Sequence, residues 1–180
     1  AHFTRYPCIQ RRESQHNRAD ITFIVLDNAG TAMTGFQPHP GLTMSALGET
    51  VPAVDIAAVC RGIGAKVAIA DPFDIDTTTK ILTGYLAQKG EVKVLILRQA
   101  CALSPEKKGK KTFDVRVNEE LCLGDACGCN RLCTRVFRCP ALTWDKDKKK
   151  AVVDEVICAG CGVCVSICPQ KAIEKAQAVI

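Results

Sequence analysis

The pattern of apolar and polar positions divides the chain into two parts. Three short apolar runs have the composition of buried parallel strands, namely Ile21–Leu26, Lys66–Ala70 and Val92–Leu97. The segments between them have helical character, because Asp55–Gly62 ends at a glycine and Asp76–Gln88 carries apolar residues at helical spacing. This order predicts an α/β layer with a parallel sheet. Three strands are few for such a sheet, so we expect further elements from a preceding segment or a partner chain.

Residues 113–176 repeat a shorter pattern twice. Each half has a strand-like run (115–117 or 151–153), then a group of cysteines, then Cys-Pro followed by further apolar residues. This internal repeat predicts a small α+β ferredoxin-like domain with two clusters. So small a module has little apolar core, and metal binding must supply much of its folding free energy.

The second cysteine group has the spacing C-x2-C-x2-C-x3-C-P, which is typical of bacterial [4Fe–4S] proteins. It consists of Cys158, Cys161, Cys164 and Cys168, with Pro169 behind them. A zinc ribbon uses two separated cysteine pairs, so the spacing favours a cluster. In this pattern the last cysteine ligates the other cluster of a pair, which predicts a further set of ligands elsewhere in the chain.

The first cysteine group has irregular spacing, with Cys122, Cys127, Cys129, Cys133 and Cys139 before Pro140. Five thiols compete for four roles. We predict Cys122, Cys133 and Cys139 as ligands, and we prefer Cys129 to Cys127 because Cys127 belongs to an inserted Gly-Asp-Ala-Cys stretch. The alternatives are a lost cluster or a [3Fe–4S] centre.

Cysteine usage and charge indicate the compartment and the partners. Nine of the 12 cysteines fall between residues 122 and 168, at spacings typical of clusters and not of a disulfide framework, so we expect a cytoplasmic protein. No apolar stretch is long enough to span a bilayer and no signal peptide opens the chain, so we expect no membrane partner.

The net charge of +5 is concentrated in one short segment. Residues 105–112 carry four lysines and one glutamate, and they are typical of a solvated linker between domains 1–104 and 113–180. A short lysine run without aromatic residues does not predict nucleic-acid binding. It is a candidate docking segment for an acidic redox partner.

A second candidate site is the loop that follows the first strand, from Asp27 to Gly41. In parallel α/β sheets, ligands bind outside the carboxyl ends of the strands. The Asn28 side-chain oxygen and the Gly30 carbonyl, together with a carboxylate and diphosphate oxygens, would satisfy octahedral Mg²⁺. From spacing alone, Asp-Asn-x-Gly is more commonly an ordinary turn.

The stretch L-D-N-x-x-T-A-M-T-G-x-Q-P-H-P-G, with Arg98, Cys101 and the two cysteine groups behind it, resembles the large subunit of indolepyruvate ferredoxin oxidoreductase. That subunit belongs to the 2-oxoacid:ferredoxin oxidoreductase superfamily, and the resemblance covers roughly residues 19–176. It implies that residues 1–104 are the C-terminal portion of a thiamine-diphosphate-binding domain. It further implies that Asn28 and the Gly30 carbonyl bind Mg²⁺, and that Thr31, Met33 and Thr34 line the cofactor.

The sequence departs from the family pattern at three points. No Gly-Asp pair, the source of the first Mg²⁺ carboxylate, precedes Asn28. Phe36 stands where the family often has His, and His39 is open to a structural or a catalytic interpretation. The domain that activates the thiazolium through a Glu does not match any part of the chain. We therefore expect the chain to be a fragment that holds clusters but turns over no 2-oxoacid by itself.

By resemblance, the function is oxidative decarboxylation of an aryl 2-oxoacid, such as indolepyruvate, to an acyl-CoA. Electrons would pass through two [4Fe–4S] clusters to a soluble ferredoxin, with coenzyme A and the remainder of the large subunit or a second subunit as further partners. A simple decarboxylase has no use for two clusters, which favours oxidation. The alternatives are a non-catalytic iron–sulfur electron-transfer subunit and a thiamine-dependent carboligase with a relic redox domain.

Overall fold

A computed structural model describes residues 16, 17, 19–104 and 111–177. The chain forms two compact units, Ala1–Ser104 and Pro105–Ile180, each of which is described by itself. Residues 105–110 of the predicted linker lie outside the described residues, and the role of the linker stays a prediction.

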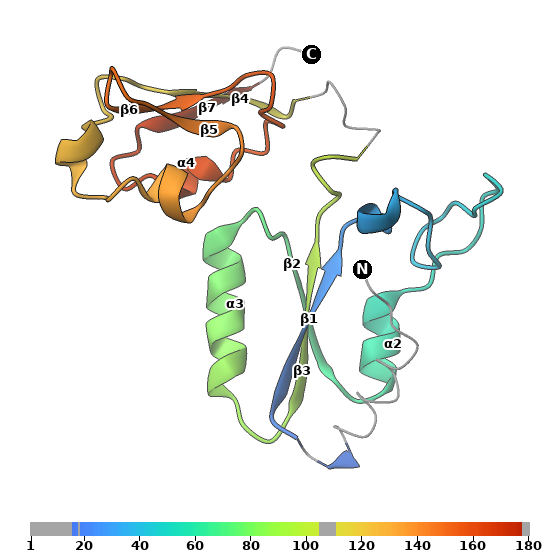
Figure 1. The fold of residues 1–180 in the computed structure, drawn as a ribbon. Coiled ribbons are helices and arrows are strands. Elements are labelled where there is room, and N and C mark those ends of the chain that lie inside the picture. The colour runs from blue at the N-terminus through green and yellow to red at the C-terminus, as the bar shows by residue number, and fades with distance from the viewer. Residues whose placement is uncertain (1–15, 18, 105–110, 178–180) are drawn as a thin grey trace. The chain divides into compact units, whose positions relative to one another are not determined.

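The first unit is a three-stranded parallel sheet with a helix on either face (Figure 1). Its strands are β1 (Ile21–Asp27), β2 (Lys66–Ala70) and β3 (Val92–Arg98), in the order β1-β3-β2. The helices are α2 (Ile56–Gly62) and α3 (Ile75–Ala87), with a 3₁₀ turn η1 (Ala32–Thr34) in the long loop before α2. The predicted strands and helices of this unit are confirmed to within one residue at each end.

Short polar side chains fix where the two helices begin. The Asp55 carboxylate accepts hydrogen bonds from the N–H groups of Ala57 and Ala58, at 2.8 and 3.1 Å, and so caps α2. Asp74 caps α3 in the same way through the N–H of Thr77 at 3.1 Å. Each carboxylate satisfies N–H groups that lack a partner in the first turn of a helix.

The core of the first unit lies on both faces of β3. On one face, Ile56, Ala57 and Cys60 of α2 pack with strand residues that include Val25, Val94 and Ile96. On the other face, Tyr85 of α3 packs with Ala70 and Leu95. The side chains of β3 from Val92 to Ile96 are all buried, which explains why its sequence is nearly continuous in apolar residues.

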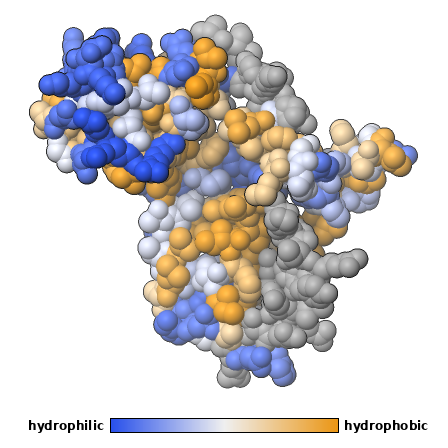
Figure 2. All heavy atoms as spheres, in the orientation of Figure 1, coloured by the Kyte–Doolittle hydropathy of each residue, from blue (hydrophilic) through white to orange (hydrophobic). Residues whose placement is uncertain are grey.

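Helix α3 leaves part of its face of the sheet uncovered. It contacts β2 and β3, whereas Ile24 and Leu26 of β1 are 49% and 59% exposed. Because Val25 points toward α2, its two neighbours point toward the face that carries α3. Figure 2 shows hydrophobic side chains on the visible surface of this unit.

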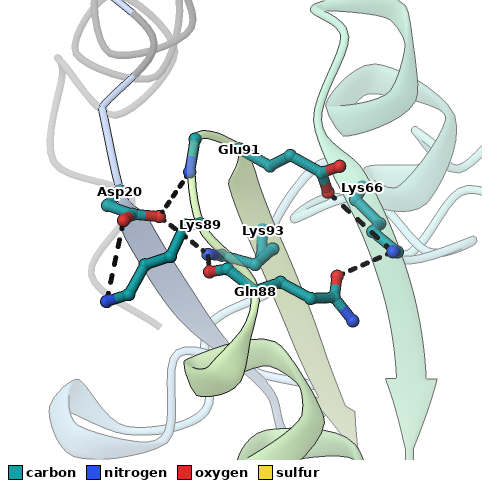
Figure 3. Close-up of polar contacts among 7 residues, drawn as sticks. Asp20, Lys66, Gln88, Lys89, Glu91 and Lys93 are labelled. Atoms are coloured by element: carbon teal, nitrogen blue, oxygen red, sulfur yellow. Dashed lines mark hydrogen bonds and ion pairs between the residues drawn. The ribbon is translucent and has the colours of Figure 1, made fainter.

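A buried lysine connects three segments at the end of the sheet where β1 and β3 begin (Figure 3). Lys93 is 2% exposed, and its Nζ lies 2.6 Å from the carbonyl oxygen of Gln88 and 3.3 Å from Asp20 Oδ1. The same Asp20 oxygen accepts the N–H of Gly90 at 2.8 Å, and Lys89 lies 3.7 Å from the other oxygen. The carboxylate therefore joins the residue before β1 to the turn between α3 and β3.

The second unit consists of two antiparallel strand pairs that surround the cysteine groups. Strand β4 (Phe113–Val117) pairs with β7 (Ile173–Gln177), and β5 (Leu142–Asp145) pairs with β6 (Lys150–Val153). Three short helical turns carry or flank the cysteines: η3 (Gly124–Cys127), η4 (Leu132–Val136) and α4 (Cys164–Ile167). The order strand, cysteine group, strand occurs twice, in agreement with the repeat in the sequence.

Thiols make up much of the interior of the second unit. Its core cluster has four buried residues, Val115, Leu142, Cys164 and Ile173. The partly buried side chains packed around them include Cys133, Cys139, Cys158 and Cys168. None of the nine cysteines of the two groups is tied in a disulfide.

Candidate functional site

Five cysteines line one pocket of the second unit. Four of them come from the first cysteine group and one from the second: Cys122, Cys127, Cys129, Cys133 and Cys168. The exposed surface inside the pocket is almost entirely apolar. Trp144 and Ile173 belong to its wall. The fold thus places Cys168 beside the first group, where the spacing predicts it.

The remaining cysteine of the first group lies beside the second group. The pKa of the Cys164 thiol is raised to about 11. Burial is the largest cause, followed by the charges of Cys161, Cys139 and Cys158. Cys139 therefore lies close enough to influence Cys164. The charge of Cys168 in turn raises the pKa of Cys133, although burial is the larger cause there. Each of the two Cys-Pro cysteines, Cys139 and Cys168, therefore lies beside the cysteine group to which it does not belong in sequence.

Two glycines allow the cysteine loops to approach a neighbouring backbone closely. Gly160, between Cys158 and Cys161, has φ +67°, and a Cβ there would lie 2.6 Å from the carbonyl oxygen of Phe113. Gly124 has φ +60°, and a Cβ there would clash with the carbonyl oxygen of Lys149. Neither contact leaves room for a side chain, so both positions require glycine.

The electrostatic surroundings distinguish Cys129 from Cys127. Burial and a hydrogen bond with Cys129 raise the pKa of Cys127. Burial would also raise the pKa of Cys129, but hydrogen bonds outweigh it and lower that pKa; the donors are the N–H of Leu132, the Cys127 thiol, and the N–H groups of Arg131 and Cys129 itself. A thiolate is the form that ligates iron, and backbone N–H groups aimed at sulfur stabilise it. The surroundings therefore favour Cys129 as the ligand.

The spread of the thiols fits clusters better than single ions. Among the described residues, no three His, Cys, Asp or Glu side chains come close enough to share one metal ion. The cysteines of a [4Fe–4S] cube each bind a different iron, so they surround a larger group. The N–H of Ala172 also donates to Cys168 Sγ at 3.3 Å, a hydrogen bond of the kind that tunes cluster potentials.

The loop after β1 contains a buried acceptor that the described residues leave without a donor. The Asn28 side-chain oxygen is inaccessible and forms no hydrogen bond with them. The backbone of Asn28 is held in place, because its carbonyl oxygen accepts the N–H of Cys101 at 3.0 Å. Gly30 is buried two residues later. A buried oxygen without a partner is costly, which makes Asn28 a candidate ligand for a cation.

The structure brings Asn28 and Gly30 together at the carboxyl end of β1, but it exposes other predicted residues of the loop. Thr31 is half-buried and pairs with Gln37, whose carbonyl accepts the Thr31 N–H at 3.0 Å. Met33 is 88% exposed, and Thr34 is exposed as well. Contact of these two side chains with a cofactor stays a prediction.

His39 carries a second buried polar atom without a partner among the described residues. Its Nδ1 accepts the N–H of Gly41 at 3.1 Å, and its Nε2 is inaccessible and forms no hydrogen bond with them. Since Nδ1 accepts, the neutral ring carries its proton on Nε2. The loop thus holds one unpaired acceptor and one unpaired donor, and the sequence alone left the role of His39 open.

An open cavity at the same edge of the sheet includes one residue, Arg61, that the sequence did not single out. About 970 Å³ of space, open to solvent, is bounded by residues that include Asp27, Gly41, Asp55, Arg61 and Arg98. Arg98 Nε donates to Asp27 Oδ2 at 2.8 Å. Arg61 lies in the last turn of α2, where a basic residue is common for reasons of the helix dipole, so its sequence position carried no signal of a site.

Two family models match the chain, one in each unit. Residues 12–96 match the thiamine pyrophosphate enzyme, C-terminal TPP binding domain, and residues 151–174 match the 4Fe-4S binding domain. The chain is also 40% identical over 171 residues to the indolepyruvate oxidoreductase subunit IorA of Pyrococcus horikoshii. That alignment covers 90% of this chain and 25% of the relative.

The chain is similar to IorA along most of its length. The corresponding subunits of Thermococcus kodakarensis and Archaeoglobus fulgidus are 39% and 36% identical, over 88% and 90% of this chain and 24% and 25% of their own lengths. The chain therefore spans about a quarter of the length of the curated relatives that it matches. No solved structure matches it significantly.

These matches confirm the predicted fold class, a thiamine-diphosphate-binding parallel-sheet domain followed by a ferredoxin-like region. The 4Fe-4S model covers the second cysteine group but not the first, which has the irregular spacing. None of the helices in the described part of the chain combines the length and the hydrophobicity that a bilayer crossing requires.

Proposed function

We propose that the chain is part of a thiamine-diphosphate-dependent 2-oxoacid oxidoreductase that passes electrons through two [4Fe–4S] clusters to ferredoxin. The carrying observation is that one polypeptide joins a loop with an unpaired, buried Asn28 oxygen to two sets of free thiols. The relatives are named for indolepyruvate, which supports an aryl 2-oxoacid as substrate, with coenzyme A as the acyl acceptor. An electron-transfer subunit without catalysis would leave the Asn28 oxygen unexplained.

Asn28 and Gly30 are the residues that would hold the cofactor through Mg²⁺. The Asn28 side-chain oxygen and the Gly30 carbonyl are neutral oxygen ligands of the kind that Mg²⁺ accepts. The hydrogen bond from Cys101 to the Asn28 carbonyl orients Asn28. We place Thr31, Met33 and Thr34 along the cofactor. Thiamine diphosphate, when bound, supplies the thiazolium carbon that attacks the carbonyl of a 2-oxoacid.

The cysteines would form two crossed sets of ligands. The first cluster takes Cys122, Cys129, Cys133 and Cys168, and the second takes Cys139, Cys158, Cys161 and Cys164. Oxidation of a 2-oxoacid to an acyl-CoA and CO₂ releases two electrons. Each cluster accepts one electron at a time, so the pair can divide the two electrons for a one-electron acceptor such as ferredoxin.

The test of this function is whether substrate electrons reach the clusters. In the complete enzyme that contains this chain, an aryl 2-oxoacid with coenzyme A, thiamine diphosphate and Mg²⁺ should bleach the visible absorbance of the clusters under anaerobic conditions. Asn28→Leu should abolish this bleaching, because it removes the cation ligand, while dithionite should still bleach the clusters.

Asn28→Asp, which keeps an oxygen at the same place, serves as the conservative control and should retain bleaching in part. Bleaching that is equally fast in wild type and Asn28→Leu would remove Asn28 from the proposed site. An enzyme whose clusters respond to dithionite but to no 2-oxoacid would contradict the oxidoreductase function itself.

A further inference from the structure

Basic and acidic residues occupy different parts of the second unit, although its net charge is close to zero. Residues 131–150 carry seven Arg and Lys against two Asp, whereas the rest of residues 113–177 carries three basic against seven acidic residues. The basic stretch includes η4 and the turn of the β5–β6 hairpin. The acidic remainder includes Asp154 and Glu155, just before the second cysteine group.

Four of these cations form what we call the basic face: Arg135, Arg138, Lys146 and Lys149. All four are exposed, and no carboxylate of the described residues lies within ion-pair distance of them. Arg135 Nη1 donates to the neutral Asn130 side chain, and Arg138 Nε donates to the carbonyl of Arg135 at 2.9 Å. None of these four cations is therefore neutralised by an ion pair within the described chain.

The basic face adjoins the pocket of the first cysteine group. A polar groove lined by Asn130, Arg131 and Arg135 shares two residues, Gly124 and Arg131, with the cysteine-lined pocket. Arg131 is fixed in this shared wall, because it bonds to Asp125 at 2.9 Å and lies 4.1 Å from the centre of the Trp144 ring. The backbone of Lys149 lies directly against Gly124, so the hairpin turn reaches the same wall.

An exposed apolar side chain lies among the cations. Val136 is 70% exposed and is separated from Arg138 by one residue, with Arg135 on its other side. A surface with an apolar centre and a charged rim is typical of transient protein–protein contacts. Hydrophilic side chains gather over the second unit in Figure 2.

We propose that the basic face is the docking surface for an acidic one-electron carrier protein, which takes electrons from the first cluster. This inference rests on the proposed function only because it requires the same iron–sulfur clusters. Charge complementarity selects the partner, since carboxylates on the carrier meet four uncompensated cations, while the acidic end near Asp154 repels it. In the transfer step the reduced cluster loses one electron and the oxidised carrier gains it, and no bond or proton changes.

The docking site differs from the one that the sequence suggested. The lysine-rich segment 105–112 stays a candidate from the sequence alone, because residues 105–110 lie outside the described chain. The basic face lies instead against the wall of a cysteine pocket, where a bound carrier would approach the first cluster through Gly124 and Arg131. The same surface would therefore both orient the carrier and bring it close to the first cluster.

The test measures electron transfer directly. The chain with its clusters, reduced by dithionite, is mixed in a stopped-flow instrument with an oxidised, acidic [2Fe–2S] ferredoxin as the probe. Transfer should slow as ionic strength rises, because steering by opposite charges is screened by salt. Arg135→Gln with Arg138→Gln should lower the second-order rate at low salt about tenfold and flatten its salt dependence. Lys146→Gln with Lys149→Gln is a second, independent pair with the same expectation.

A matched control removes the same charge elsewhere. Lys80→Gln with Lys171→Gln also lowers the net charge by two but lies outside the basic face, and it should change the rate less than about twofold. Equal slowing by the control would mean that only total charge matters, and unchanged rates in both test pairs would overturn the docking site. Faster transfer to basic cytochrome c than to the acidic ferredoxin would overturn it too. A wild-type chain without dithionite-reducible clusters would instead refute the proposed function.

Discussion

At the scale of single residues, the first cysteine group shows how backbone geometry can select a ligand. Cys129 and Cys127 line the same pocket and are hydrogen-bonded to each other. Asn130 and Arg131 both have positive φ, at 50° and 56°. Against the effect of burial, the N–H groups of Leu132 and Arg131 in this tight turn lower the pKa of Cys129, and the Leu132 N–H also donates to the Cys129 carbonyl at 3.1 Å. For Cys127, burial and the Cys129 side chain raise the pKa and outweigh the Cys129 N–H and the Gln170 side chain, which lower it. The preference for Cys129 thus has a physical cause in the turn that follows it.

Iron content tests this preference and the exchange of Cys139 and Cys168. After anaerobic reconstitution the wild-type chain should bind roughly eight irons, four for each cluster. Cys129→Ser and Cys168→Ser should each reduce this to roughly four, because both remove a ligand of the first cluster. The double variant should lose no more iron than either single one. Iron and acid-labile sulfide assays, with EPR of the reduced protein, provide the measurement.

Cys127→Ser is the matched control, since it changes the neighbouring thiol of the same pocket and should keep the iron content of the wild type. If Cys127→Ser loses iron while Cys129→Ser does not, the two assignments must be reversed. If Cys129→Ser combined with Cys168→Ser binds almost no iron, the two residues serve different clusters and the exchange is wrong.

At the scale of elements, the Asp20–Lys93 contact determines how the strands of the first unit begin. Lys93 occupies a central position of the sheet, where its side chain cannot reach bulk water. Burial would raise the pKa of Asp20, but hydrogen bonds from Lys93 and Gly90 and the charges of Lys89 and Lys93 outweigh it and lower that pKa. Only Lys93 of this pair is buried, since the Asp20 side chain is 39% exposed. Removing the Asp20 charge therefore leaves a buried ammonium group with the Gln88 carbonyl as its remaining acceptor.

We therefore expect Asp20→Asn to destabilise the first unit and Lys93→Met to be nearly neutral. Because the pKa of folded Asp20 lies below its unfolded value, the carboxylate stabilises the fold above the unfolded pKa, about 4. That contribution is lost as pH falls through the folded pKa. The difference between wild type and Asp20→Asn should be full at pH 7 and shrink below about pH 4.

Hydrogen exchange of β3 amides in the cluster-free chain measures this difference. Lys93→Met shows what remains when the buried charge itself is absent, and in that background Asp20→Asn should have little further effect. A stability difference that stays constant from pH 7 to pH 3 would show that Asp20 acts through hydrogen bonding to Gly90 and not through its charge.

At the scale of the whole chain, the two units depend on different sources of stability. The first unit has two apolar clusters on opposite faces of a sheet. The second unit has four buried residues in its core cluster, one of them Cys164, and fills the space around them with further thiols. No disulfide joins the thiols of the two cysteine groups. Cluster binding must therefore supply much of the stability of the second unit.

Removal of the clusters should unfold the second unit and leave the first intact. Anaerobic treatment with an iron chelator should remove amide protection from β4–β7 and β5–β6, while β1, β2 and β3 keep theirs. Hydrogen exchange read by mass spectrometry resolves the two units by peptide, and the sheet of the first unit serves as the internal control. Loss of protection in both units together would show that they fold cooperatively and would contradict this division.

Much of this architecture was predictable from the sequence, for identifiable reasons. Strand β3 is a nearly continuous apolar run because it is buried on both faces, and the helix predicted from Asp55 has Asp55 as its cap. Asp74, which caps α3, was not predicted, because the sequence pattern placed the start of that helix at Asp76. The cluster pattern around Cys158 depends on local spacing alone. By contrast, the place of Cys139 depends on tertiary structure that brings distant segments together, and sequence spacing contains no such information.

The same limit explains what the sequence missed around the loop after β1. The motif indicates Asn28, but spacing does not show that its side-chain oxygen is buried without a partner among the described residues. The cations of the basic face escaped notice because the second unit is nearly neutral in total. Only the fold shows that Arg135 and Lys149 lie beside the same cysteine pocket.

The contact between Gly124 and the Lys149 carbonyl limits how the protein can vary in length. The β5–β6 turn is exposed and polar, which ordinarily marks a place where insertions are tolerated. Here the turn backbone closes against the loop that carries Cys122 and Cys127, so an added residue would move the Lys149 carbonyl away from Gly124 and open the wall of the pocket. Epitope tags, labels and natural insertions belong in other loops of this unit, and side-chain changes in the hairpin are tolerated more readily than changes in its length.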